Sequence, residues 1–173
     1  YNVPFYMRDV IPNIYEHWIA RNIIAYMKAA EGDRDRSVIL QIANRPKRYI
    51  GRECLDECTV DFEKVRRYYE DKYWMIKKID QLESDLAVLR RMDPYTAINY
   101  IRHGIGYEGY LQEYADYRKI QAEDLLQLLD QLQESAKGFK TVQEWFAHIE
   151  EYGKMLKEQN QKERKADNQV TFS

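Results

Sequence analysis

The chain has 173 residues, of which 45% are hydrophobic and 32% are charged, with only 7 Gly and 4 Pro. This composition excludes disordered, collagen-like and fibrous proteins, no apolar run is long enough to span a membrane, and the length suits one domain with its own core. The net charge of -2 argues against a protein that coats nucleic acid by bulk electrostatics, so any contact with DNA must come from a local patch.

The N-terminal residues are apolar and aromatic. Residues 3–7, with Pro4 near their start, favour a short edge strand. Residues 1–5 contain no Met and lack the layout of a signal peptide, so we interpret them as the beginning of an excised segment rather than a natural N-terminus.

A helix is expected to follow, capped by Asp9 or Asn13, with Pro12 in its first turn and Gly32 at its end. Its apolar stripe consists of Ile14, Trp18, Ile19, Ile23, Tyr26 and Met27. The spacing of three and four residues is typical of a helix that buries one face.

Besides a short helix expected at residues 53–58, two more helices are predicted before residue 93. The first covers residues 37–43 and stops at Asn44-Arg45-Pro46, because a residue before proline is disfavoured in the helical region. The second runs without interruption over residues 61–92, the longest periodic stretch of the chain. Its apolar repeat consists of Phe62, Val65, Tyr69, Ile76, Ile79, Leu82, Leu86 and Leu89.

The remaining chain is also predicted to be helical. Helices are expected from 93 to 104, after 106, from 122 to 135 and from 141 onward. The last begins with a capping box, because the Thr141 hydroxyl lies three residues before Glu144. Residues 157–168 are nearly all polar, as in a solvated helix end or a linker, and residues 169–173 are β-prone again.

The predicted fold is therefore all-α, a helical body bracketed by two short β-prone ends. This arrangement is expected if a helical insert is excised from a sheet-containing host domain, since insertions are tolerated where chain ends lie close together.

A basic turn, residues 44–52, is the first candidate site. Arg45, Lys47, Arg48 and Arg52 place four positive charges within eight residues, with no acid among them. A short basic loop is usually only a solvated surface. Here the turn also opens a predicted helix, so that charge and helix dipole add at one place and phosphate binding is favoured.

The second candidate is the stretch from Tyr100 to Tyr107. A helix that ends at Gly104 and restarts at Gly106 has the shape of a helix-hairpin-helix element. The second glycine leaves room for a phosphate against the free amides of the next helix, and His103 borders the same turn. The alternative is a tight turn without a ligand.

Nothing in the sequence indicates a catalytic or metal site. No nucleophile elbow, phosphate-binding lysine loop or HExxH motif is present, and the three histidines lack ligand spacing. Cys54 and Cys58 are too few for structural zinc and are interpreted as reduced thiols. The 15 tyrosines suggest base stacking, but most fall on apolar stripes, where a core position is favoured: Tyr26, Tyr69, Tyr110 and Tyr114.

The chain resembles the accessory 2B domain of UvrD/PcrA/Rep-type superfamily 1 DNA helicases. Residues 14–27 resemble the segment that leaves the 2A motor domain, and residues 42–51 resemble the family's Asn-x-Pro-x-Arg-Gly-Ile-Gly element, which holds duplex DNA. Tyr49 stands where the family has glycine; the matching residues are Asn44, Pro46, Arg48, Ile50 and Gly51. Residues 101–114 are similar to a later hairpin of that domain, and residues 170–172 to a strand that follows it.

The resemblance implies three parts: residues 1–12 end a 2A-type motor domain, residues 13–165 form the helical 2B-type domain, and residues 166–173 return to the motor domain as a strand. It implies a cytoplasmic parent that is an ATP-dependent helicase, moves 3′ to 5′ and acts in DNA repair or replication. ATP and Mg belong to other parts of that parent, so this segment is expected to be inactive alone and to need no cofactor.

The expected partners are duplex DNA, the junction of single and double strands, and the remaining helicase domains, with no membrane. The expected DNA-binding residues are Arg45, Lys47, Arg48, Tyr49, Gly51, Arg52, His103, Gly104, Gly106 and Tyr107. The alternative is a helical protein-interaction domain that recruits a repair or transcription protein, for which a large exposed apolar patch would be the sign.

Overall fold

The computed structural model describes residues 12–172, and the side chains of residues 12–168. Within that part the chain is all-α, as predicted, and has no strand beyond one isolated bridge between Asp35 and Thr59. The elements are η2 (Ile14–Glu16), α1 (Trp18–Ala30), α2 (Arg36–Ile42), η3 (Arg52–Cys54), α3 (Phe62–Tyr68), α4 (Tyr73–Leu89), α5 (Pro94–Asn99), η4 (Tyr100–Ile105), α6 (Tyr107–Arg118), α7 (Ala122–Ser135) and α8 (Val142–Phe172). The edge strand expected at 3–7 lies outside the described residues.

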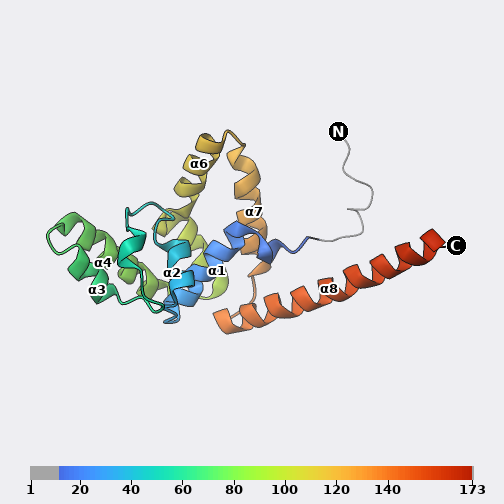
Figure 1. Cartoon of the computed structure of the whole chain (residues 1–173). Coiled ribbons are helices and arrows are strands. Elements are labelled where there is room, and N and C mark those ends of the chain that lie inside the picture. Colours follow the sequence, from blue (N-terminus) through green and yellow to red (C-terminus); the bar gives the residue numbers. More distant parts are fainter. Residues whose placement is uncertain (1–11, 173) are drawn as a thin grey trace.

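Helix α1 is the centre of the fold and packs against α2, α4 and α7 (Figure 1). Its apolar residues cover more than one face, which suits a helix with neighbours on several sides. Ile19, Ile23 and Tyr26 are fully buried. The predicted cap at Asn13 belongs to the 3-10 turn η2, and α1 itself is capped by Nδ1 of His17, which accepts from the Ile19 amide at 3.1 Å.

The single long helix predicted for residues 61–92 is wrong, because the chain turns back between α3 and α4. The turn over residues 70–72 is polar and exposed, so nothing anchors it in the core. Arg66 of α3 reaches across to pair with Asp80 at 2.8 Å and with Glu83, both on α4. The apolar residues keep their spacing of three and four positions across the break, because both helices bury their apolar stripes in one core.

The C-terminal helix α8 begins with the predicted capping box: the Glu144 amide donates to Oγ1 of Thr141 at 3.1 Å, and the Thr141 amide donates to the Glu144 carboxylate. Its first half packs on the body, with Trp145 and Leu156 buried. Its second half extends away from the other helices (Figure 1). Residues 169–172 are helical, which corrects the β-prone end expected there, because the polar run before them carries α8 onward.

No helix in the described part of the chain is both long and apolar enough to cross a membrane.

Replacing Ile23 with alanine tests the central position of α1. Because Ile23 is fully buried, the free energy of unfolding is expected to fall by about 2–5 kcal/mol. Ile120→Ala removes the same atoms from an exposed position and is expected to cost less than about 1 kcal/mol. Urea unfolding followed by far-ultraviolet circular dichroism measures both, and equal losses would contradict this position of α1.

Candidate nucleic-acid interface

The Arg48 side chain lies inside the protein and is only 7% exposed. Its Nη1 donates to the carbonyl oxygens of Ile42 at 2.6 Å and Ala43 at 3.2 Å, at the C-terminal end of α2. Its Nη2 donates to the Tyr26 hydroxyl at 2.9 Å. A cation at a helix C-terminus is favourable, and these bonds satisfy carbonyl groups that the helix leaves unpaired. The guanidinium is therefore engaged, which corrects the expectation that it contacts phosphate.

Asn44 fixes the path of the basic turn. Its Oδ1 accepts from the backbone amides of Arg48 at 3.2 Å and Ile50 at 3.0 Å, and its Nδ2 donates to the Ile50 carbonyl at 2.8 Å. Tyr26 adds a bond to the Arg45 carbonyl at 2.6 Å. Since Ile50 is also buried, the turn is held at both ends and its geometry is set by side chains of the body.

Tyr49 adopts the left-handed backbone conformation, with φ 62°. This region is disfavoured for residues with a Cβ and is the natural region of glycine, which the similar helicase element has at this position. The Tyr49 ring is 67% exposed. The turn thus keeps the shape that a glycine would give it, at a cost in backbone strain.

Gly51 does not offer a free amide to a ligand. Its N–H donates to the Tyr69 hydroxyl at 2.8 Å, and the Glu53 carboxylate lies where a Cβ of Gly51 would stand. The element that follows is only the three-residue turn η3. The expected addition of a helix dipole at this place is therefore wrong, and the remaining means of binding are the exposed side chains.

Those side chains belong to a larger cationic surface. Residues 17–30 and 36–52 contain seven Lys and Arg and no Asp or Glu, and they fold together as α1, α2 and the basic turn. None of the seven forms an ion pair with a carboxylate of the described residues. Arg36 donates to the Leu55 carbonyl and Arg48 is buried, which leaves Arg21, Lys28, Arg45, Lys47 and Arg52. We call these five residues the cationic surface.

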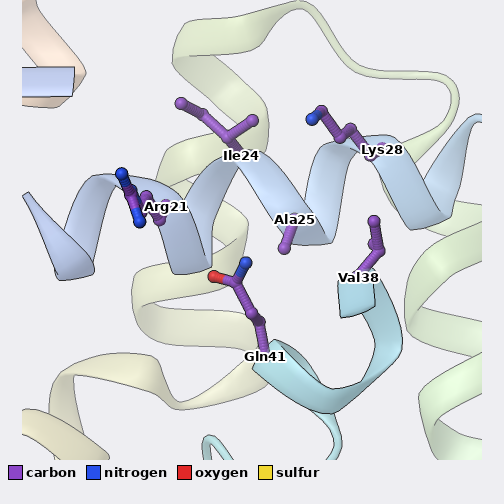
Figure 2. Close-up of a pocket in the computed structure, with 6 residues that line it drawn as sticks. All are labelled: Arg21, Ile24, Ala25, Lys28, Val38 and Gln41. Carbon is purple, nitrogen blue, oxygen red and sulfur yellow. The ribbon is translucent and has the colours of Figure 1, made fainter. Parts of the chain in front are cut away.

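A groove of about 270 Å³ runs between α1 and α2 within this surface (Figure 2). Arg21 and Lys28 flank it from α1, and Gln41 points into it from α2. Arg45 donates to the backbone carbonyl oxygen of Gln41 at 3.1 Å. The groove therefore borders the basic turn at Gln41, a relation that spacing in the sequence did not indicate.

The second turn, at Gly104 and Gly106, has a structural role between η4 and α6. The helix continues past Gly104 as the π-helical η4 and breaks only at Gly106, with φ 96°. Gly104 is required for packing, because a Cβ there would lie 2.6 Å from the Tyr100 ring. The Tyr107 ring is buried, and its hydroxyl donates to Oδ1 of Asn22 at 2.7 Å; burial raises the pKa of this hydroxyl. Tyr107 therefore holds the second turn against α1 and is not exposed to a ligand.

A carboxylate of the chain itself occupies the start of α6. Glu108 lies in its first turn and accepts from Arg102 at 2.7 Å, with the exposed His103 at 3.5 Å. Arg102 is buried and also pairs with Asp130 at 2.8 Å. This negative charge disfavours a phosphate at Gly106, so the two predicted turns are unequal: both pack on α1, but only the basic turn presents unpaired cations.

In the described part of the chain, no group of three or more His, Cys, Asp or Glu side chains is placed to hold a metal ion. Cys54 and Cys58 are free thiols, and burial raises the pKa of the Cys54 thiol.

The chain is similar to the Bacillus subtilis (strain 168) protein named "Putative ATP-dependent DNA helicase YjcD". The two are 24% identical over 161 residues, which cover 86% of this chain and 20% of that protein, so the chain spans about a fifth of this relative. No protein-family model matches the chain, and no solved structure matches it. The similarity relates the chain to a segment of a DNA helicase.

Arg48→Ala is expected to lower the free energy of unfolding by roughly 2–4 kcal/mol, because it leaves buried carbonyl groups at the end of α2 without donors. The matched control is Arg52→Ala, which removes an exposed guanidinium without an ion pair among the described residues and is expected to change stability by less than about 0.5 kcal/mol. Urea unfolding compares the two, and a stability of Arg48→Ala equal to that of the wild type would refute the structural role.

Tyr49→Gly is expected to raise the free energy of unfolding by about 0.5–1 kcal/mol, because relief of left-handed strain exceeds the added flexibility of the unfolded chain. Tyr117→Gly, at an exposed position of helix α6, is expected to lower it by about 0.5 kcal/mol. Thermal and urea unfolding provide the measurement. Destabilisation by both glycines would show that position 49 is not strained.

Proposed function

We propose that this chain is a DNA-binding accessory segment of an ATP-dependent DNA helicase, equivalent to the 2B domain, and that it grips the duplex backbone near the junction and regulates unwinding. The observation that carries the proposal is the cationic surface: five cations without an ion pair among the described residues, from two segments of the sequence that contain no Asp or Glu, on a chain of net charge -2. Such local separation of charge is what a phosphate backbone requires of a protein that is acidic overall.

The proposed contacts are made by side chains to phosphate oxygens, and not to base edges. Arg45, Lys47 and Arg52 extend from a turn whose backbone is fixed by Asn44, so little backbone conformational entropy is lost when they bind. Arg21 and Lys28 continue the same charge along the α1–α2 groove. Contacts of this kind position DNA without reading its sequence, which suits a helicase that acts on many sequences.

The similarity to a protein named as a DNA helicase supports the same proposal. ATP and Mg would be bound by the remainder of the parent protein, and this segment would contribute binding and regulation. Action in repair or replication, the junction as the preferred DNA and the cytoplasmic location are parts of the proposal that derive from the helicase resemblance.

An interaction role is the second candidate, favoured by exposed aromatic residues at one end of the α3–α4 pair. Tyr68, Tyr73 and Trp74 are all more than half exposed. Aromatic side chains are enriched at protein interfaces, so this end of the molecule is where a repair or transcription protein would bind. It lies on helices other than those that bear the cationic surface.

The proposal predicts the salt dependence of DNA binding. Fluorescence anisotropy of the whole chain with a duplex bearing a 3′ single-stranded tail is measured over a salt series. In the triple variant Arg45→Gln, Lys47→Gln, Arg52→Gln, the slope of log K against log salt is expected to fall in magnitude by about two to three, since each phosphate contact contributes about 0.9.

The matched control is the triple variant Arg67→Gln, Arg90→Gln, Arg91→Gln, which removes three exposed cations without ion pairs among the described residues, from α3 and from the end of α4. Its slope is expected to equal that of the wild type. Equal reductions in both variants would mean that net charge alone governs binding, and no binding by the wild type at low salt would refute the proposal.

A further inference from the structure

A second groove borders the basic turn on the side of α6. It has a volume of about 280 Å³ and is lined by Lys47, Tyr110, Glu113, Tyr114 and Tyr117. We call it the tyrosine groove. Lys47 belongs both to this groove and to the cationic surface, so the two sites are continuous at that residue.

Two tyrosines close to Lys47 are largely exposed. Tyr117 is 83% exposed and Tyr49 is 67% exposed. Tyr49 also has a left-handed backbone conformation, which is strained for a tyrosine. An aromatic ring that stays in water adds little to folding, and glycine would relieve the strain at position 49. Strain held at a surface aromatic residue points to a function for the ring.

The groove wall is ordered by ring packing. Tyr114 packs on Trp18 with ring centroids 4.9 Å apart, and it lies roughly parallel to Tyr110 at 6.5 Å and 30°. The Arg118 guanidinium lies 5.6 Å from the Tyr114 ring centroid, and the Lys47 ammonium lies 5.5 Å from that of Tyr49. The wall is therefore preorganised, with cations beside π faces, which is the combination found where single strands stack on proteins.

Charge fixes which side of a strand faces α6. The residues that line the groove carry two charges, the Glu113 carboxylate and the Lys47 ammonium, and the Arg118 guanidinium lies beside the Tyr114 ring. Phosphates are attracted to the basic turn and repelled from Glu113, so the backbone would follow the turn while the bases face the tyrosines. A duplex keeps its bases stacked inside and cannot offer them to these rings, whereas unpaired nucleotides can.

We propose that Tyr49 and Tyr117 stack on unpaired nucleobases while Lys47 contacts the adjacent phosphate, so that this surface binds single-stranded DNA beside the duplex contacts. This proposal rests on the proposed DNA-binding function, and it adds single-stranded DNA as a second ligand beside the duplex. The specificity is for unpaired bases of any sequence, because every base has a π face.

The test uses the whole chain and three ligands in anisotropy titrations: oligothymidylate, an abasic oligonucleotide of the same length, and a blunt duplex. In the variants Tyr49→Gly and Tyr117→Ala, affinity for oligothymidylate is expected to fall about tenfold each. Affinities for the abasic strand and the duplex are expected to change less than about twofold, because these ligands keep their phosphates but present no unpaired bases. Tyr49→Phe and Tyr117→Phe are expected to bind oligothymidylate as the wild type does, since stacking needs the ring and not the hydroxyl.

Two exposed aromatic residues on α4 serve as the control. The double variant Tyr73→Ala, Trp74→Ala removes rings of similar exposure, and its affinity for oligothymidylate is expected to equal that of the wild type. Unchanged oligothymidylate binding in the Tyr49 and Tyr117 variants, or an equal loss for the abasic strand, would overturn the stacking proposal. The cation variants would still lower duplex binding in that case, whereas a wild type that binds none of the three ligands would overturn the DNA-binding function itself.

Discussion

The guanidinium of Arg48 is a positive charge inside the protein, and the shape of the basic turn depends on how that charge is satisfied. It donates to the carbonyl end of α2 and to Tyr26 of α1, so that the turn is held to two helices at once. Burial raises the pKa of the Tyr26 hydroxyl, which Arg48 lowers in part. With Arg48 drawn inward, the residues on either side of it, Lys47 and Tyr49, extend outward. One buried cation thus organises the exposed ones.

Helix α1 connects this turn to the rest of the site. Tyr26 supports the basic turn, and Asn22, one turn earlier on the same helix, accepts from Tyr107 at the start of α6. The tyrosine groove therefore stands at a fixed position relative to the cations, although its residues lie far away in the sequence. Electrostatic attraction and base stacking, which differ in salt dependence, would act on neighbouring nucleotides at one surface.

The all-α fold could be predicted because capping residues and apolar spacing are local signals. Thr141 and Glu144 form the predicted box, and α2 ends at Ile42, before the Asn44-Arg45-Pro46 stretch that was expected to stop it. The break between α3 and α4 could not be predicted, because both helices bury their stripes in one core and the repeat continues across the turn. The basic turn was found by its charge, but a sequence does not distinguish a buried arginine from an exposed one. The position of Arg48, the α1–α2 groove and the exposed pair Tyr49 and Tyr117 all depend on tertiary contacts.

DNA binding at the cationic surface and the adjoining tyrosine groove is common to both proposals. The most direct measurement is hydrogen–deuterium exchange of the whole chain, alone and with a tailed duplex. Binding at this surface is expected to slow exchange in peptides that cover residues 44–52 and α6, and to leave exchange in α3 and α4 unchanged. Protection confined to α3 and α4, or no protection at DNA concentrations that saturate binding, would contradict it.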